Sequence, residues 1–214
     1  MLKKIITSLL FLSTIHASKI HILGDSHSRE FTNIANTVIH HVGPATMYKA
    51  GRDQLSFVDI RQFGVVDGDV IIFSLGEIDA RCHIEKQSIL QNRSLDDIIH
   101  SLAAQYIDFI LNNITPYDSI TPIIYSITPP TDIITNPDLP IYGSLVNRVL
   151  ITKRLNQILK LLADENDILF LDVYQYYADD RGALIDELGD GNVHINQDSY
   201  HYIENELYKL LKNR

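Results

Sequence analysis

The chain has little cysteine and few basic residues for its 214 residues. The single Cys82 excludes a disulfide within the chain, so the cysteine content says nothing about the redox compartment. Lys and Arg number 18 against 27 Asp and Glu, which gives a formal net charge of −9. Beyond the N-terminus there is no run of basic residues of the kind that nucleic-acid phosphates require. We therefore expect no nucleic-acid partner.

Internal repeats, linkers and low-complexity segments are also missing from the sequence. The hydrophobic content of 45% and the charged content of 21% are those of an ordinary globular protein. A chain of this length is large enough to bury a sizeable core. We predict a single domain at residues 19–214.

The N-terminus has the composition of a signal peptide. Residues 1–4 (MLKK) are positively charged, and residues 5–15 form an apolar run that is too short to cross a bilayer. Small residues at 17–18 end this run. We expect residues 1–18 to be removed and the protein to be secreted or periplasmic, without stable membrane insertion after cleavage. An N-terminal packing helix or an uncleaved anchor is the alternative.

Short apolar runs alternate with amphipathic segments along the rest of the chain. The pattern predicts strands at 20–24, 45–50, 70–73, 120–127 and 168–173. It predicts helices at 31–42, 57–63, 95–113, 145–163 and 198–211, with residues 77–93 polar and irregular. Because nearly every position of each strand is apolar, the class is α/β, with a parallel sheet covered on both faces.

Ser26 lies between the end of the first predicted strand and the start of the following helix. Open α/β sheets bind their ligands at such a point, beyond the carboxyl ends of the strands. The backbone N–H groups of the coming helix also favour developing negative charge there. Ser26 is therefore a candidate nucleophile. The alternative is that Asp25 or Ser26 only caps the helix.

A serine nucleophile needs a base and a group that orients the base, and a later segment supplies both. His194 precedes the last predicted helix and is the candidate base, and Asp190, four residues earlier, is the candidate orienting group. The N–H groups of Ser26 and Gly51 are candidate donors to an oxyanion. Loss of one such donor typically slows a reaction by about a hundred- to a thousand-fold.

With these residues the chain resembles the SGNH/GDSL hydrolase superfamily from about residue 19 to the C-terminus. The resemblance implies a three-layer α/β/α sandwich with a flavodoxin-like, five-stranded parallel sheet of order 2-1-3-4-5. It also implies a serine esterase that needs no metal or organic cofactor and acts on a small O-acyl ester, such as an acetyl group on a glycan. The matching blocks are Gly24-Asp25-Ser26, the oxyanion glycine Gly51, Gly76-Glu77-Ile78-Asp79, and Asp190 with His194.

Two features depart from the family pattern. Ile78 stands where the third block, Gly-x-Asn-Asp, has its asparagine, so a side-chain donor to the oxyanion is missing. The last block reads Asp-x-x-x-His instead of Asp-x-x-His, so Asp190 must reach His194 through a longer turn. We expect Arg81 to face the site and supply positive charge, and Asp79 to contribute to the binding of the oxyanion or substrate. The alternative is that Arg81 pairs with Glu77 or Asp79 within a polar loop.

Two other functions remain open at this point. The sequence around Asp25, His27 and Asp79 is not far from the motifs of two-metal phosphoesterases, whose hard ligands are Asp and His. The same fold without its asparagine would also serve as a binding module that holds a glycan or acyl group without turnover. Retention of Ser26, Asp190 and His194 together favours catalysis over the binding module.

Overall fold

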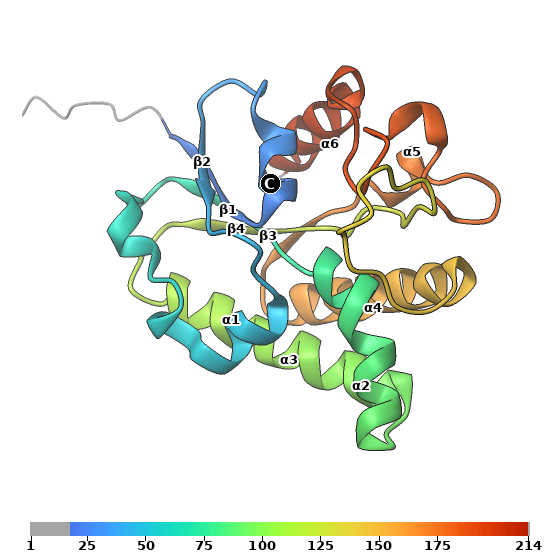
Figure 1. The fold of residues 1–214 in the computed structure, drawn as a ribbon. Helices are drawn as coiled ribbons and strands as arrows, with labels where there is room; N and C mark the ends of the chain where they lie inside the picture. The colour runs from blue at the N-terminus through green and yellow to red at the C-terminus, as the bar shows by residue number, and fades with distance from the viewer. Residues whose placement is uncertain (1–17, 214) are drawn as a thin grey trace, which may run out of the picture.

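The computed structural model describes residues 18–213, which form an α/β/α sandwich around one parallel sheet (Figure 1). Its five strands have the order β2-β1-β3-β4-β5, and every neighbouring pair is parallel. The fold class and the strand order are therefore confirmed. The strands are β1 (Ile20–Gly24), β2 (Thr37–His41), β3 (Val70–Ser74), β4 (Thr121–Tyr125) and β5 (Leu169–Leu171).

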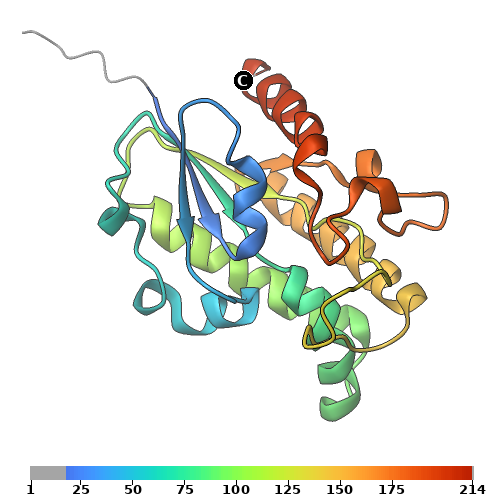
Figure 2. The ribbon, with the colours of Figure 1, turned by 45° about the horizontal axis from the view of Figure 1, so that its top comes forward.

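Helices cover both faces of the sheet, because side chains alternate between the faces along each strand and both faces are apolar. On one face, Leu23, Phe73 and Ile124 pack against α1 (Met47–Asp53), α3 (Leu95–Ile114) and α4 (Leu145–Glu165). On the other, Ile22 and Ile72 pack against the 3-10 helix η1 (Ser26–Phe31), α5 (Tyr174–Tyr177) and α6 (His201–Lys212). Figure 2 shows the two helical layers on either side of the strands.

Two predicted elements near the N-terminus were wrong. The segment expected as a helix at 31–42 contains strand β2, and the segment expected as a strand at 45–50 contains the start of helix α1. The β-branched run Thr37-Val38-Ile39 suits a strand, and it pairs with β1 residue by residue. Thr46 then caps α1, because its hydroxyl accepts the N–H of Lys49 at 3.0 Å.

The segment at 77–93 also differs from the prediction of irregular structure. It forms one π-helical turn (Asp79–His83) and the helix α2 (Ile84–Gln91). The predicted signal peptide lies outside the described residues except for Ser18. Within residues 18–213, no helix is long and apolar enough to cross a membrane.

Gly24 allows the end of β1 to lie against β3 and so determines where the chain turns after β1. It pairs with Ser74 of β3, and a Cβ atom at Gly24 would lie only 2.2 Å from the Ser74 carbonyl oxygen. Only glycine permits this approach of the two strands. The chain then turns at Asp25, whose N–H donates to the same Ser74 oxygen at 3.3 Å. Ser26 therefore begins its helix at the carboxyl edge of the sheet.

Candidate active site

Ser26 is the first residue of η1, and its side chain is free of the capping role. Asp25 is the N-cap residue, and its Oδ1 accepts the N–H of His27 at 3.0 Å. The Ser26 Oγ instead lies 2.7 Å from Nε2 of His194. Of the two residues considered as caps, Asp25 caps the helix and Ser26 faces the histidine.

His194 and Asp190 lie in the loop before α6. The Nδ1 of His194 is 3.1 Å from Oδ2 of Asp190, so the two ring nitrogens face Asp190 and Ser26. With its proton on Nδ1, the ring donates to Asp190 and presents a lone pair at Nε2 to the serine hydroxyl. The structure thus brings together all three residues expected to carry the chemistry.

The longer turn between Asp190 and His194 closes on itself. The N–H of Asp190 donates to the His194 carbonyl at 2.9 Å. Oδ1 of Asp190 accepts the N–H groups of Asn192 at 2.8 Å and His194 at 3.3 Å. The extra residue is therefore accommodated in a turn that Oδ1 of Asp190 stabilises, and Oδ2 remains available to the His194 ring.

The site is partly exposed to solvent at the side chains of His194 and Asp190 and buried beneath them. The side chain of His194 is 27% exposed and that of Asp190 is 34% exposed. Burial lowers the pKa of His194 from its ordinary value of 6.5, and the neighbouring His27 lowers it further, while the bond to Asp190 acts in the opposite direction. His194 is therefore neutral, and able to accept a proton, at neutral pH.

A buried chain of charged residues lies under the histidine. Nδ1 of His27 is 2.9 Å from Oε1 of Glu30, and its Nε2 is 3.8 Å from Oε2 of Glu77. Glu77 also accepts the Nε–H of Arg81 at 2.6 Å, and Arg81 donates in addition to the carbonyl of Pro140. Burial alone would raise the pKa of Glu77, but His27 and Arg81 hold it at about 2.

Arg81, Asp79 and Gly51 do not lie where the sequence suggested. Arg81 is only 6% exposed, and its charge is taken up by Glu77 and by the loop at 131–143, so it braces the site from below. Asp79 accepts the N–H of Met47 at 2.7 Å and holds the start of α1. Burial raises the pKa of Asp79 to about 7, against the effect of this bond.

Gly51 requires a correction for a different reason. It lies inside α1, where a backbone N–H is committed to the carbonyl four residues earlier. A Cβ atom there would lie 2.7 Å from the Cβ of Gln105 in α3. Gly51 therefore allows two helices to pack closely, and this position does not suit an oxyanion donor.

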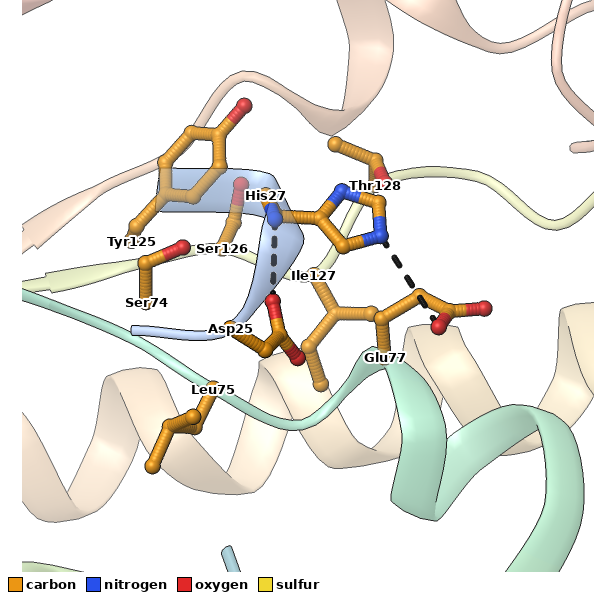
Figure 3. Close-up of a pocket in the computed structure, with 9 residues that line it drawn as sticks. All are labelled: Asp25, His27, Ser74, Leu75, Glu77, Tyr125, Ser126, Ile127 and Thr128. Carbon is orange, nitrogen blue, oxygen red and sulfur yellow. Dashed lines mark hydrogen bonds and ion pairs between the residues drawn. The ribbon is translucent and has the colours of Figure 1, made fainter. Parts of the chain in front are cut away.

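A small cavity of about 10 Å³ lies between the ends of β1, β3 and β4, which is about the space that one water molecule needs (Figure 3). It is lined by Asp25, His27 and Thr128, among others. Asp25 Oδ2, His27 Nε2 and Thr128 Oγ1 are buried and have no hydrogen-bond partner in the described part of the chain.

The residues of the two-metal alternative are engaged in other contacts. Asp25 caps η1, His27 lies between Glu30 and Glu77, and Asp79 holds α1. Within residues 18–213, no group of three or more His, Cys, Asp and Glu side chains is placed to hold a metal ion. Nothing in the described structure supports the phosphoesterase alternative.

The sequence analysis predicted the ionic chain of His27, Glu30, Glu77 and Arg81 only in part. Its signal was present as two helical spacings, His27 to Glu30 at i,i+3 and Glu77 to Arg81 at i,i+4. The pair of Glu77 and Arg81 is the alternative that the sequence offers for Arg81, and the structure has it. The pair of His27 and Glu30 was not predicted, because a helix was expected to begin only at residue 31.

No protein-family model and no curated protein matches this sequence. Solved structures match its fold. A structure described as an acylhydrolase from Bacteroides fragilis has a TM-score of 0.62 and 16% identity over 93% of this chain and 88% of its own. A GDSL-like lipase from Bacteroides thetaiotaomicron has a TM-score of 0.60 and 15% identity over 92% and 88%.

A catalytic mutant of an acetylxylan esterase from Geobacillus stearothermophilus has a TM-score of 0.56 and 14% identity, over 91% of this chain and 94% of its own. These structures cover almost the whole described chain, and each is an acylhydrolase, lipase or esterase by name. The chain therefore has the fold of the SGNH/GDSL hydrolase superfamily.

Proposed function

We propose that the protein is a serine esterase that hydrolyses a carboxylic O-acyl ester. One observation carries the proposal: the hydrogen-bonded chain from Ser26 Oγ through His194 to Asp190, with contacts of 2.7 Å and 3.1 Å. A nucleophile, a base and a group that orients the base are the arrangement that acyl transfer through a serine requires.

The mechanism follows from the roles of the three side chains. Ser26 Oγ attacks the ester carbonyl while His194 Nε2 takes its proton, and His194 then gives that proton to the leaving alcohol. Asp190 keeps the other ring nitrogen protonated and stabilises the imidazolium. Water, activated by the same histidine, then hydrolyses the acyl-enzyme and restores Ser26.

The oxyanion that forms in each step needs hydrogen-bond donors. Ser26 is the first residue of η1, and the first N–H groups of a helix have no partner within the helix. Its N–H is therefore our assigned donor to the oxyanion, with the charge favoured further by the helix N-terminus. Arg81 supports this region through Glu77 and is not assigned a direct contact with the substrate.

The substrate class that we propose is a small O-acyl ester on a hydroxyl-rich molecule, such as an acetylated glycan, ahead of long lipid esters. A groove of about 520 Å³ lies between α1, α2 and α3 and is within the size range of small-molecule sites, but neither Ser26 nor His194 lines it, so it does not decide between these substrates. The name of the acetylxylan esterase neighbour agrees with an acetylated glycan as the substrate class.

The test is hydrolysis of a panel of p-nitrophenyl esters and acetylated oligosaccharides. We expect Ser26→Ala to lower kcat/KM by at least about a thousand-fold while the protein stays folded. Ser119→Ala is the matched control, because Ser119 is exposed in a remote loop. Equal rates for the Ser26 variant and the wild type would refute the proposal, and a fully inactive wild type would favour a binding module.

A further inference from the structure

A second histidine lies directly against the proposed base. The rings of His27 and His194 have centroids 4.7 Å apart and planes inclined by 46°. His27 is 4% exposed and Glu30 is 1% exposed, so this pair is buried under the partly exposed His194. The proposed esterase mechanism uses neither of them.

Both ring nitrogens of His27 face carboxylates. Glu30 lies 2.9 Å from Nδ1 and Glu77 lies 3.8 Å from Nε2 (Figure 3 shows the second contact). Only the imidazolium carries a proton on both nitrogens. Two buried carboxylates with a single cation, Arg81, would leave an unbalanced charge in a buried region, which is costly. A charged His27, together with Arg81, balances the charges of Glu30 and Glu77.

Further contacts fix this cluster to the segment that carries the base. Glu30 Oε1 accepts the N–H of Ile195, the residue after His194, at 3.3 Å, and Oε2 accepts the hydroxyl of Tyr125 at 2.7 Å. Through Glu30, His27 is therefore linked to β4 and to the loop of His194. A change at His27 acts on His194 through both position and charge.

The ionisable groups around the two histidines are few. Asp190 faces His194 from the same loop, and His27 and Glu30 face it from η1. Tyr200 is also near, and burial, with smaller effects of Glu30 and Asp190, raises its pKa. His27 is faced by Asp25, Glu30 and Glu77 besides His194. In this set, only His27 brings positive charge to His194.

We propose that His27 is a positioning residue, held as an imidazolium between Glu30 and Glu77, that packs under His194 and favours its neutral, proton-accepting form. The proposal rests on the proposed function, because it takes His194 as the base. The cation opposes a second positive charge on His194, and Asp190 partly offsets this repulsion. Burial alone would lower the pKa of His27, but Glu30 and Glu77 raise it well above 6.5.

The first test uses the wild-type protein labelled with ¹⁵N at the histidine rings. NMR shifts of the ring nitrogens report directly whether each carries a proton. We expect both nitrogens of His27 to remain protonated at pH 7, whereas an ordinary histidine loses one proton near pH 6.5. A His27 ring with one bare nitrogen at pH 7 would overturn the proposal, and no variant needs to fold for this result.

The second test compares His27→Gln with His100→Gln, which makes the same change at an exposed histidine of α3. We expect the NMR titration midpoint of His194 to rise by roughly one pH unit in His27→Gln, the size expected for two charges about 5 Å apart near water. The acid limb of kcat/KM should move upward by the same amount. His100→Gln should leave both unchanged.

These readouts separate the two ideas. Esterase activity with an unshifted His194 in His27→Gln would refute the role of His27 and leave the proposed function standing. A shifted His194 in a protein without esterase activity would refute the proposed function, and with it the catalytic meaning of the shift. His27→Asn provides the same loss of charge if the glutamine variant does not fold.

Discussion

Replacing Gly24 with alanine places a methyl group against the backbone of the neighbouring strand. The new Cβ atom would lie 2.2 Å from the carbonyl oxygen of Ser74 and 2.8 Å from its Cβ, where ordinary contacts begin near 3.4 Å. Neither strand is free to move away, since β1 lies between β2 and β3, and β3 lies between β1 and β4. The clash therefore has to be relieved by shifting the backbone at Gly24 and Ser74.

The cost has two parts. Overpacking in a well-packed core costs about 1–3 kcal/mol. Displacing the Ser74 oxygen also weakens its bond from the Asp25 N–H, currently 3.3 Å long, which is worth about 1 kcal/mol. We expect Gly24→Ala to lower the free energy of unfolding by about 2–4 kcal/mol, a large part of the 5–15 kcal/mol typical of a domain.

The assay is urea unfolding of Gly24→Ala beside Gly43→Ala. Gly43 has φ +81° and no atom within 4 Å of a Cβ atom, so its variant carries only the backbone cost of about 1 kcal/mol. Because Ser26 follows two residues after Gly24, kcat/KM of the folded Gly24 variant should fall by about a hundred-fold. Equal midpoints for the two variants, at unchanged m-values, would refute this reasoning.

Four further predictions follow from the site. Because the pKa of His194 is lowered, kcat/KM should stay level at neutral pH and decline only below pH 6.5, as His194 becomes protonated; a decline that begins above pH 7 would contradict the assignment. Asp190→Asn should slow kcat by about 10²- to 10⁴-fold with little change in stability, measured by steady-state kinetics and thermal unfolding. Asp79→Ala should lower the free energy of unfolding by about 1–3 kcal/mol, because the buried Met47 N–H loses its acceptor. Asp79→Asn keeps an acceptor oxygen and should lower it by less. Equal losses of unfolding free energy for the two variants, measured by urea unfolding, would argue against that contact. Dialysis against EDTA should leave the hydrolysis rate unchanged, and a loss restored by a divalent metal would revive the phosphoesterase alternative.

The positions of Ser26, Asp190 and His194 could be anticipated because each follows or precedes a regular element at the same edge of the sheet. In a parallel sheet, the carboxyl ends of all strands meet at one edge, so residues far apart in sequence converge there. Strong local signals placed these elements: the apolar run of β3, and the turn residues around Gly24 and before α6. This part of the site needs no knowledge of side-chain packing.

The errors arose where a contact distant in sequence decides the structure. The apolar spacing at 31–42 suits a helix as well as a strand, and the pairing of Thr37–His41 with β1 decides in favour of the strand. Because β2 ends at His41 and α1 begins at Met47, Gly51 lies inside a helix and not in the loop after the strand. Arg81 faces Glu77 instead of the substrate, because the two become neighbours only on a helical turn.

The most direct test of the central claim is covalent trapping of the nucleophile. A fluorophosphonate ester reacts with an activated serine when Oγ attacks phosphorus and fluoride leaves, and peptide mass spectrometry then locates the adduct. We predict a single adduct on the peptide that contains Ser26, formed at least about a hundred-fold more slowly in His194→Gln and absent from Ser26→Ala. An adduct elsewhere on the chain, or none on a folded wild-type protein, would contradict the assignment of Ser26 as the nucleophile.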